Sequence, residues 1–128
     1  MSLKKLYIGC SLTQAPKLFI SHIETLKSEL KNDFQILDFI GLTGKTSEEV
    51  YEHDRKCVLE SDLFLAVCDY PSIGLGMEIG FAIENNKRIL IAYSKNNKIT
   101  RMVLGIPKTS NIFFLEYTNT REIINFLK

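Results

Sequence analysis

The sequence predicts an α/β fold in which a five-stranded parallel sheet carries helices on both of its faces. Short apolar runs alternate along the chain with longer segments whose apolar residues recur at helical spacing. The apolar runs lack the polar alternation of a half-exposed strand, which is typical of strands buried on both faces. Strands and helices that alternate in this way predict parallel strands joined by helical crossovers.

The first half of the chain predicts two strands and two helices. Residues 6–10 and 34–40 are the apolar runs expected as strands. Between them, Pro16 suits the first turn of a helix, because its missing N–H needs no partner there, and helical spacing continues to residue 32. Thr46 and the acids that follow it are typical of a capped helix start, and this second helix is expected to reach residue 61.

The second half of the chain predicts the remaining elements. Its most apolar run, at residues 62–68, is the expected central strand. Gly105 and Pro107 are typical of residues that close a short helix. The further strands are expected at 88–93 and 112–115, and the helices at 74–83, 99–104 and 119–128. This arrangement predicts a single domain, residues 1–128, with a flavodoxin- or Rossmann-like sheet.

Composition narrows the choice of function. Of the 128 residues, 45% are hydrophobic and 24% are charged, which is ordinary for a globular domain. The 16 basic and 15 acidic residues leave a net charge of +1, which gives no support for binding to nucleic acid or to a membrane surface. Because the sequence has no secretory leader pattern and no apolar run of membrane-spanning length, we expect a cytoplasmic protein.

The most informative stretch runs from Asp69 to Ala82, directly after the predicted central strand. Pro71 cannot continue such a strand, and Gly74 and Gly76 are expected to let the backbone turn tightly into the next helix. Ser72 stands where a helix cap belongs, so its hydroxyl can accept from free backbone amides. Ligands of open α/β sheets bind at the carboxyl ends of the strands, so this stretch is the predicted site.

Two carboxylates are the candidate reactive groups. Glu78 lies about one turn into the helix after Ser72, where the helix dipole is expected to keep it ionised. Asp54 falls within the apolar stripe of the preceding helix, which is costly for an acid unless it is functional or hydrogen-bonded to a nearby loop. A carboxylate can attack an anomeric carbon while a second acid assists the leaving group. That stripe is set by Val50, Tyr51, Cys57 and Val58.

Other motifs have plainer explanations. Gly44-Lys45-Thr46 lacks the upstream glycine of a phosphate loop, and the glycines from 74 to 80 lack the dinucleotide-binding spacing. Gly76 and Gly80, four residues apart, are explained by close packing of the helix that carries them. Tyr7 is expected to be a core tyrosine unless its hydroxyl reaches the pocket.

The cysteines and histidines are expected to be structural, with no metal site and no cofactor. The three cysteines have no close pair and lie in apolar surroundings, so we expect reduced core residues. The two histidines lack metal-ligand spacing and are expected on solvated helix faces. These residues are Cys10, Cys57, Cys68, His22 and His53.

Three segments together resemble a known family. They are Asp54, then Ser61-Asp62 with the apolar strand that follows, then Pro71-Ser-Ile-Gly-Leu-Gly-Met-Glu-Ile-Gly-Phe-Ala82. They resemble the nucleoside 2-deoxyribosyltransferase superfamily, and within it the 2'-deoxynucleoside 5'-phosphate N-hydrolases. The resemblance covers nearly the whole chain, and the Pro71–Ala82 block is its specific part. It implies a double displacement at the anomeric carbon of a deoxyribose.

The resemblance also implies roles for the reactive side chains. Glu78 matches the nucleophile, Asp54 matches the acid that orients it and assists the leaving base, and Tyr7 matches a first-strand tyrosine beside the nucleophile. The family usually has glycine where this chain has Cys10, and often an arginine where this chain has Thr13.

Further positions match the substrate-binding parts of the family. Ser72 and Ser11 match serines that contact a 5'-phosphate, and Gly74 and Gly76 belong to the same substrate-binding block. Thr100 stands near a serine that a neighbouring subunit supplies, which implies a homodimer or a higher homo-oligomer.

The implied function is hydrolysis of 2'-deoxynucleoside 5'-monophosphates to a free base and deoxyribose 5-phosphate through a covalent glycosyl-Glu78 intermediate. One alternative is a transferase that exchanges bases on free deoxynucleosides, and another is a non-catalytic nucleotide-binding module. Transferases tend to carry an acid where this chain has Ser72. Because an aspartate would repel a phosphate dianion, Ser72 favours the hydrolase, and the presence of both Glu78 and Asp54 argues against a binding module.

Overall fold

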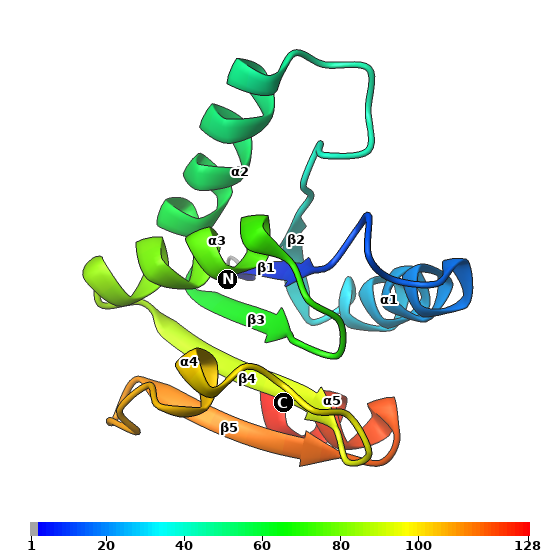
Figure 1. Cartoon of the computed structure of the whole chain (residues 1–128), viewed down its shortest axis with the longest axis vertical. Helices are drawn as coiled ribbons and strands as arrows, with labels where there is room; N and C mark the ends of the chain where they lie inside the picture. The colour runs from blue at the N-terminus through cyan, green and yellow to red at the C-terminus, as the bar shows by residue number, and fades with distance from the viewer. Residues whose placement is uncertain (1–2) are drawn as a thin grey trace.

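The computed structural model describes residues 3–128 and has the predicted fold class, a five-stranded all-parallel sheet between helices (Figure 1). The strands are β1 Lys4–Cys10, β2 Phe34–Leu37, β3 Leu63–Val67, β4 Arg88–Ser94 and β5 Ile112–Tyr117. Their order across the sheet is β2-β1-β3-β4-β5. The chain therefore winds outward in both directions from β1 and β3, which is the flavodoxin-like order.

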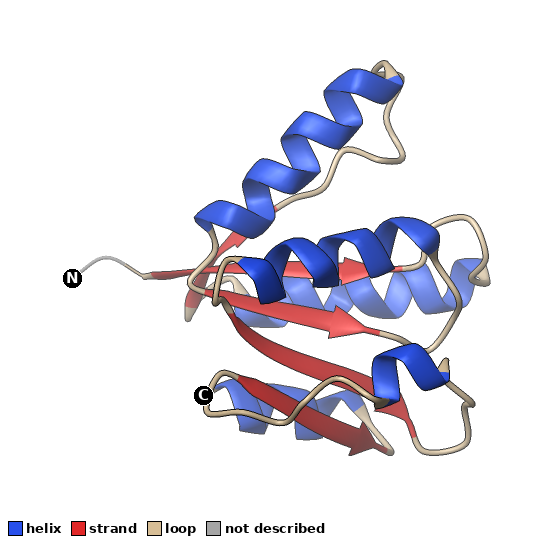
Figure 2. Ribbon diagram, turned by 60° about the vertical axis from the view of Figure 1, so that its left-hand side comes forward, coloured by secondary structure: helices blue, strands red, loops and turns tan. Residues whose placement is uncertain are grey.

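Helices cover both faces of the sheet, as predicted (Figure 2). They are α1 Lys17–Leu30, α2 Ser47–Glu60, α3 Ile73–Glu84, α4 Arg101–Leu104 and α5 Thr120–Leu127. The buried residues of α1 and α5 pack in one apolar cluster, and those of α2 and α3 pack in another on the opposite face. Within residues 3–128, no helix is both long enough and apolar enough to cross a membrane.

Successive residues of the central strands alternate between these two clusters. In β1, Leu6 and Ile8 join the cluster under α1 and α5, whereas Tyr7 joins the cluster under α2 and α3. In β3, Phe64 follows Tyr7 into the second cluster and Leu65 joins the first. Because side chains of a strand alternate between faces, this register turns Tyr7 toward α3.

The second strand is shorter than expected. It ends at Leu37, where its pairing with Tyr7 of β1 also ends, rather than at Ile40. The backbone N–H of Ile40 donates to Asp54 Oδ1 at 3.0 Å. The expected strand end is wrong because this amide is committed to a side chain of α2 and not to a neighbouring strand.

The turn into α3 also differs from the expectation. Gly74 and Gly76 lie inside the helix, and no glycine among residues 3–128 has a positive φ. Ser72 makes the turn with an extended backbone and caps the helix, as predicted. A Cβ added at Gly76 or Gly80 would meet nothing within 4 Å, so close helix packing does not explain these glycines.

Helix α2 is buried only near its carboxyl end. The predicted capping box at Thr46 and Glu49 is present. The buried residues are Cys57 and Val58, whereas Tyr51 is 49% exposed, so the expected burial of Tyr51 is wrong. Figures 1 and 2 show the reason, because the amino-terminal half of α2 rises beyond the edge of the sheet.

Candidate active site

Glu78 is held against the first strand by α3. Leu75 and Ile79 bury one side of the helix in the sheet, and the Ser72 hydroxyl accepts from the backbone N–H of Leu75 at 3.0 Å. On this anchored helix, Glu78 Oε2 accepts a hydrogen bond from the hydroxyl of Tyr7. Tyr7 is therefore both a core residue, 1% exposed, and a residue whose hydroxyl reaches the site.

Gly9 gives the Glu78 carboxylate its space. A Cβ at Gly9 would lie 3.0 Å from Glu78 Oε1, 3.0 Å from Phe64 Cε1 and 2.9 Å from Leu75 Cδ1. An added methyl group would press on the ends of these three side chains, so glycine at residue 9 leaves room for the Glu78 carboxylate beside β1.

Burial changes the acidity of both members of the Tyr7–Glu78 pair. It raises the pKa of Glu78 to about 7, an increase that the Tyr7 hydrogen bond reduces and the nearby Asp54 carboxylate reinforces. The expectation that the helix dipole keeps Glu78 fully ionised is wrong. Glu78 is the sixth residue of α3, and the dipole acts mainly within the first turn. Burial and Glu78 together raise the pKa of Tyr7 far above its ordinary value, so Tyr7 stays protonated and donates.

Asp54 faces the same space from α2. Its Oδ1 accepts from the Ile40 N–H, so the predicted bond to a nearby loop is present. Burial raises the pKa of Asp54, and the Ile40 hydrogen bond and the adjacent His53 lower it. His53 itself is not fully solvated as expected, since its Nε2 lies 2.7 Å from the carbonyl oxygen of Asp38.

A cavity of about 250 Å³ brings these groups together. A second cavity of about 430 Å³ shares Asp54 and Glu78 with it, and adds Tyr51, Met77 and Phe81. The two carboxylates therefore lie where the two cavities adjoin. The smaller cavity is lined by Tyr7, Gly9, Cys10, Leu12, Thr13, Phe39, Gly41, Val50, Asp54, Ser72, Gly74, Leu75 and Glu78.

The two cavities differ in charge. None of the described residues that line the smaller cavity is a lysine or an arginine. Lys45 and Arg55 line the larger cavity, and the Arg55 guanidinium lies 5.4 Å from the centre of the Phe81 ring. The described residues that line the smaller cavity therefore offer neutral donors only, whereas the end at Tyr51 and Phe81 offers flat rings and cations. Lys98 lines a third cavity that also contains Ser72.

The remaining predicted site residues lie elsewhere. Ser11 is fully buried, accepts from the Gln14 N–H at 3.3 Å and is not among the residues that line the cavity. Thr100 caps α4 by accepting from the Met102 N–H at 3.3 Å. Thr100 lines a different cavity of about 480 Å³, together with Ser72 and Gly76. The structure thus brings together Tyr7, Asp54, Ser72, Gly74 and Glu78, and leaves Ser11, Gly76 and Thr100 outside their cavity.

Several residues that line the cavity were not among the predicted site residues. Gly9, Phe39 and Gly41 all line the cavity of the carboxylates. Gly9 had a readable signal, because a glycine inside a buried strand often marks a close approach. Phe39 and Gly41 carried no such signal in the sequence, because Phe39 was expected in a strand and Gly41 in the loop after it.

The three cysteines are buried in the core, and one of them lines the cavity. Cys10, Cys57 and Cys68 are free and buried, as predicted. Burial raises the pKa of Cys10 to about 12, so this residue lines the cavity as a neutral thiol. Across residues 3–128, no three His, Cys, Asp or Glu side chains gather closely enough to hold a metal ion.

Comparisons with known proteins give relatives in sequence and in fold. No protein family model matches the chain. A protein of Syntrophotalea carbinolica, provisionally named 2'-deoxynucleoside 5'-phosphate N-hydrolase 1, is 33% identical over 103 residues, which are 79% of this chain and 69% of that protein. A relative of the same name from Nematostella vectensis is 32% identical over 78 residues, 58% of this chain and 53% of that protein. The match thus spans about half the length of this second relative.

Solved structures share the fold over nearly the whole chain. A CMP N-glycosidase from Clostridium botulinum superposes with a TM-score of 0.74 at 21% identity, over 97% of this chain and 98% of the other. A 2-deoxyribosyltransferase from Leishmania mexicana gives 0.64 at 12% identity, over 97% and 96%. At these identities the likeness concerns the fold alone.

Proposed function

The chain belongs to the 2'-deoxynucleoside 5'-phosphate N-hydrolase family, and we propose that it hydrolyses the N-glycosidic bond of 2'-deoxynucleoside 5'-monophosphates. The products are a free base and deoxyribose 5-phosphate. One observation carries the proposal: Glu78 accepts from Tyr7 and lines one cavity with Asp54 and Ser72.

In the first step, the Glu78 carboxylate attacks C1' of the sugar. The C1'–N bond breaks, its electron pair leaves with the base, and Asp54 donates a proton to that base. The raised pKa of Asp54 favours this acid role. Tyr7 donates to Glu78 and holds one carboxylate oxygen, so the other is free to react.

In the second step, water replaces Glu78 at C1'. The Asp54 carboxylate left by the first step accepts a proton from this water as its oxygen bonds to C1'. Glu78 departs as a carboxylate, which restores the starting state of both acids. This exchange of acid and base roles is ordinary in retaining enzymes, in which one of the two carboxylates forms a covalent sugar intermediate.

The two adjoining cavities orient the substrate. With C1' at Glu78, the 5'-phosphate points toward Ser72 and the base enters the cavity of Tyr51 and Phe81. The Ser72 oxygen already accepts from Leu75, so its own O–H remains free to donate to a phosphate oxygen. Aromatic side chains there suit the flat face of a base.

A second subunit completes the phosphate site in this proposal. The cavity around Glu78 has no lysine or arginine among the described residues that line it, although a phosphate dianion must be bound there. Thr100 lies outside this cavity. The apolar residue Ile73, which shares a different cavity with Thr100, is 87% exposed, and Met102, two residues after Thr100, is 86% exposed. A homodimer would cover such residues and bring Thr100 to a neighbouring site. A fully active monomer in sedimentation at micromolar concentration would contradict it.

The absence of a cation from the smaller cavity also favours a second candidate function. A transferase that exchanges bases on free deoxynucleosides needs no charge to balance a phosphate. A non-catalytic binding module finds less support, because binding alone needs neither the buried Glu78 nor Asp54.

Product analysis separates the two enzymes. The protein is incubated with deoxynucleosides and with their 5'-monophosphates, each with and without a second base. We expect deoxyribose 5-phosphate from the monophosphates and no base exchange. If the free nucleoside is preferred and a new nucleoside appears with the second base, the transferase is the correct function.

Ser72→Asp sharpens this test. Aspartate caps helices as well as serine does, so the bond to Leu75 can be kept while a negative charge is added. Losing a hydrogen bond to phosphate and adding repulsion should lower kcat/KM for the monophosphate about tenfold or more relative to the free nucleoside. Equal effects on both substrates would show that Ser72 does not contact the phosphate.

A further inference from the structure

Lys27 is a buried lysine whose position the proposed reaction leaves unexplained. It lies on α1, on the opposite face of the sheet from α2 and α3, and is 7% exposed. Lysine is rarely buried unless its charge is paired, because an ammonium group loses much solvation energy in the interior. Its burial therefore points to specific partners.

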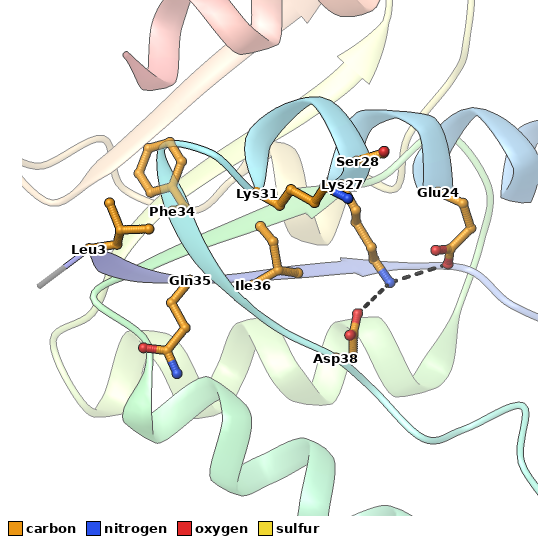
Figure 3. Close-up of a pocket in the computed structure, with 9 residues that line it drawn as sticks. All are labelled: Leu3, Glu24, Lys27, Ser28, Lys31, Phe34, Gln35, Ile36 and Asp38. Atoms are coloured by element: carbon orange, nitrogen blue, oxygen red, sulfur yellow. Dashed lines mark hydrogen bonds and ion pairs between the residues drawn. The ribbon is translucent and has the colours of Figure 1, made fainter.

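Figure 3 shows Lys27 between Glu24 of its own helix and Asp38, which follows the second strand. Lys27 Nζ is 3.3 Å from Asp38 Oδ1 and donates to Glu24 Oε1 at 3.3 Å. The same ammonium group lies 4.0 Å from the centre of the Phe39 ring, a cation–π contact. Two consecutive residues after β2 are thus fixed to α1 by one side chain.

The other side of the same segment is fixed to α2. The carbonyl oxygen of Asp38 lies 2.7 Å from His53 Nε2 and accepts from the Cys57 thiol at 3.6 Å. Two residues further on, the Ile40 N–H donates to Asp54 Oδ1 at 3.0 Å. Residues 38–40, called here the anchor segment, therefore connect Lys27 on one face of the sheet with Asp54 on the other.

We propose that Lys27 is a positioning residue for Asp54, acting through the anchor segment. This inference rests on the proposed function, because it assigns Asp54 a part in the reaction. Lys27 touches neither cavity that contains Glu78 and contacts no reacting atom. Its effect is to fix Asp38 and Phe39, so that the Ile40 amide points at Asp54 and holds one carboxylate oxygen in place.

The geometry of α2 explains why such an anchor is needed. Only Cys57 and Val58 of this helix are buried, and both lie on the carboxyl side of Asp54. The half of α2 that precedes Asp54 has no buried residue to fix it. The hydrogen bond from Ile40 supplies that restraint, and Lys27 holds the backbone that makes it.

The test compares Lys27→Met with Lys31→Met. Methionine keeps the apolar stem of Lys27 and its packing on Phe39 but removes the charge. Lys31 lines the same groove as Lys27 but is exposed, so it is the matched control. We expect Lys27→Met to lower kcat about tenfold with KM changed less than about twofold, and Lys31→Met to change neither. Lys27→Arg, which keeps the charge, should recover most of the loss.

A mutant cycle distinguishes positioning from general damage. If Lys27 acts through Asp54, Lys27→Met should cause no further loss of kcat in an Asp54→Asn background. A loss as large as in the wild type, or an unchanged kcat per folded molecule in Lys27→Met, would overturn the proposal. Unfolding in urea supplies the folded fraction for each variant.

One measurement keeps this inference separate from the proposed reaction. Hydrogen exchange at the Ile40 amide reports its bond to Asp54 and requires no turnover. We expect a protected amide in the wild type and in Lys31→Met, and faster exchange in Lys27→Met. Equal protection in all three proteins would refute the anchor. If the wild type releases no base from any monophosphate, the proposed function is wrong, whatever hydrogen exchange shows at Ile40.

Discussion

The two carboxylates of the site stand on helices that are built in different ways. Helix α3 is buried along its length by Leu75, Ile79 and Ala82, and Glu78 receives its hydrogen bond from Tyr7 inside the sheet. Helix α2 is buried only at its carboxyl end, and Asp54 receives its hydrogen bond from the backbone of a connecting segment. One acid is fixed by the core, whereas the other is fixed by a contact between surface elements.

This difference suits the two proposed tasks. A nucleophile must stand at a fixed distance from the reacting carbon, because small displacements lower the rate strongly. The acid acts first on the leaving base and then on the water that enters at the same place, and such proton transfer contributes only part of the rate. The comparison predicts that changes at Glu78 abolish turnover, whereas changes around Asp54 reduce it.

Removal of the nucleophile should have the largest effect. Glu78→Gln keeps an oxygen that accepts from Tyr7 but cannot form the glycosyl intermediate. We expect kcat to fall about a thousandfold or more, with the fold intact. Glu84→Gln, an exposed position at the end of the same helix, is the control. Near-normal base release by Glu78→Gln would rule out covalent catalysis by this residue.

Loss of the acid should be less severe. Asp54→Asn can still accept from the Ile40 N–H but cannot donate a proton to the base in the manner of a carboxylic acid. We expect kcat to fall about a hundredfold while KM stays similar. Glu52→Gln, exposed on the same helix, should leave both constants unchanged. If Asp54→Asn is less stable but fully active per folded molecule, Asp54 only supports the loop.

The α3 side of this comparison could largely be predicted from the sequence. Three signals predicted a strand, a turn and a helix start in that order: the apolar run before Asp69, then Pro71, then the Ser72 cap. Each of these signals is local, because it depends on backbone chemistry within a few residues. The parallel sheet with helices on both faces followed from the alternation of strands and helices, and it is confirmed.

The α2 side could be predicted only in part. The Thr46 capping box and the unusual place of Asp54 were readable. The partner of Asp54 was not, because the Ile40 amide comes from a segment that resembles a strand. Helical periodicity also predicted a buried Tyr51, which is exposed. Periodicity gives the side of the helix on which a side chain lies, but it does not show whether the sheet extends as far as that residue.

Crowding beside Glu78 should have an intermediate effect. In Gly9→Ala, the new methyl group would press on Glu78 Oε1 and on Leu75, both about 3 Å away. We expect kcat to fall about tenfold and the free energy of unfolding to fall by about 1–3 kcal/mol. Gly80→Ala is the control on α3, because its methyl group meets nothing within 4 Å. It should keep full activity and gain about 0.5–1 kcal/mol of stability. Unchanged activity in Gly9→Ala would show that the fit at Glu78 is loose.

The smallest expected effect concerns the pH dependence that Tyr7 gives to Glu78. In the proposed reaction Glu78 acts as a carboxylate, so kcat/KM should fall as the pH drops through its pKa of about 7. Because the Tyr7 hydroxyl donates to the carboxylate and lowers that pKa, Tyr7→Phe should move this acid limb to higher pH. The charged group that also acts on Glu78 is Asp54, which is present in both proteins.

The measurement is kcat/KM from pH 5 to 9 for wild type and Tyr7→Phe, with one substrate throughout so that titration of a phosphate affects both proteins equally. We expect the variant to lose several-fold at pH 6 and to approach the wild type above pH 8, where Glu78 is ionised in both. Tyr93→Phe, at a half-buried tyrosine outside the cavity of Glu78, is the control. An equal loss at every pH would mean that Tyr7 orients Glu78 without tuning its acidity, and the core would then fix the nucleophile by position alone.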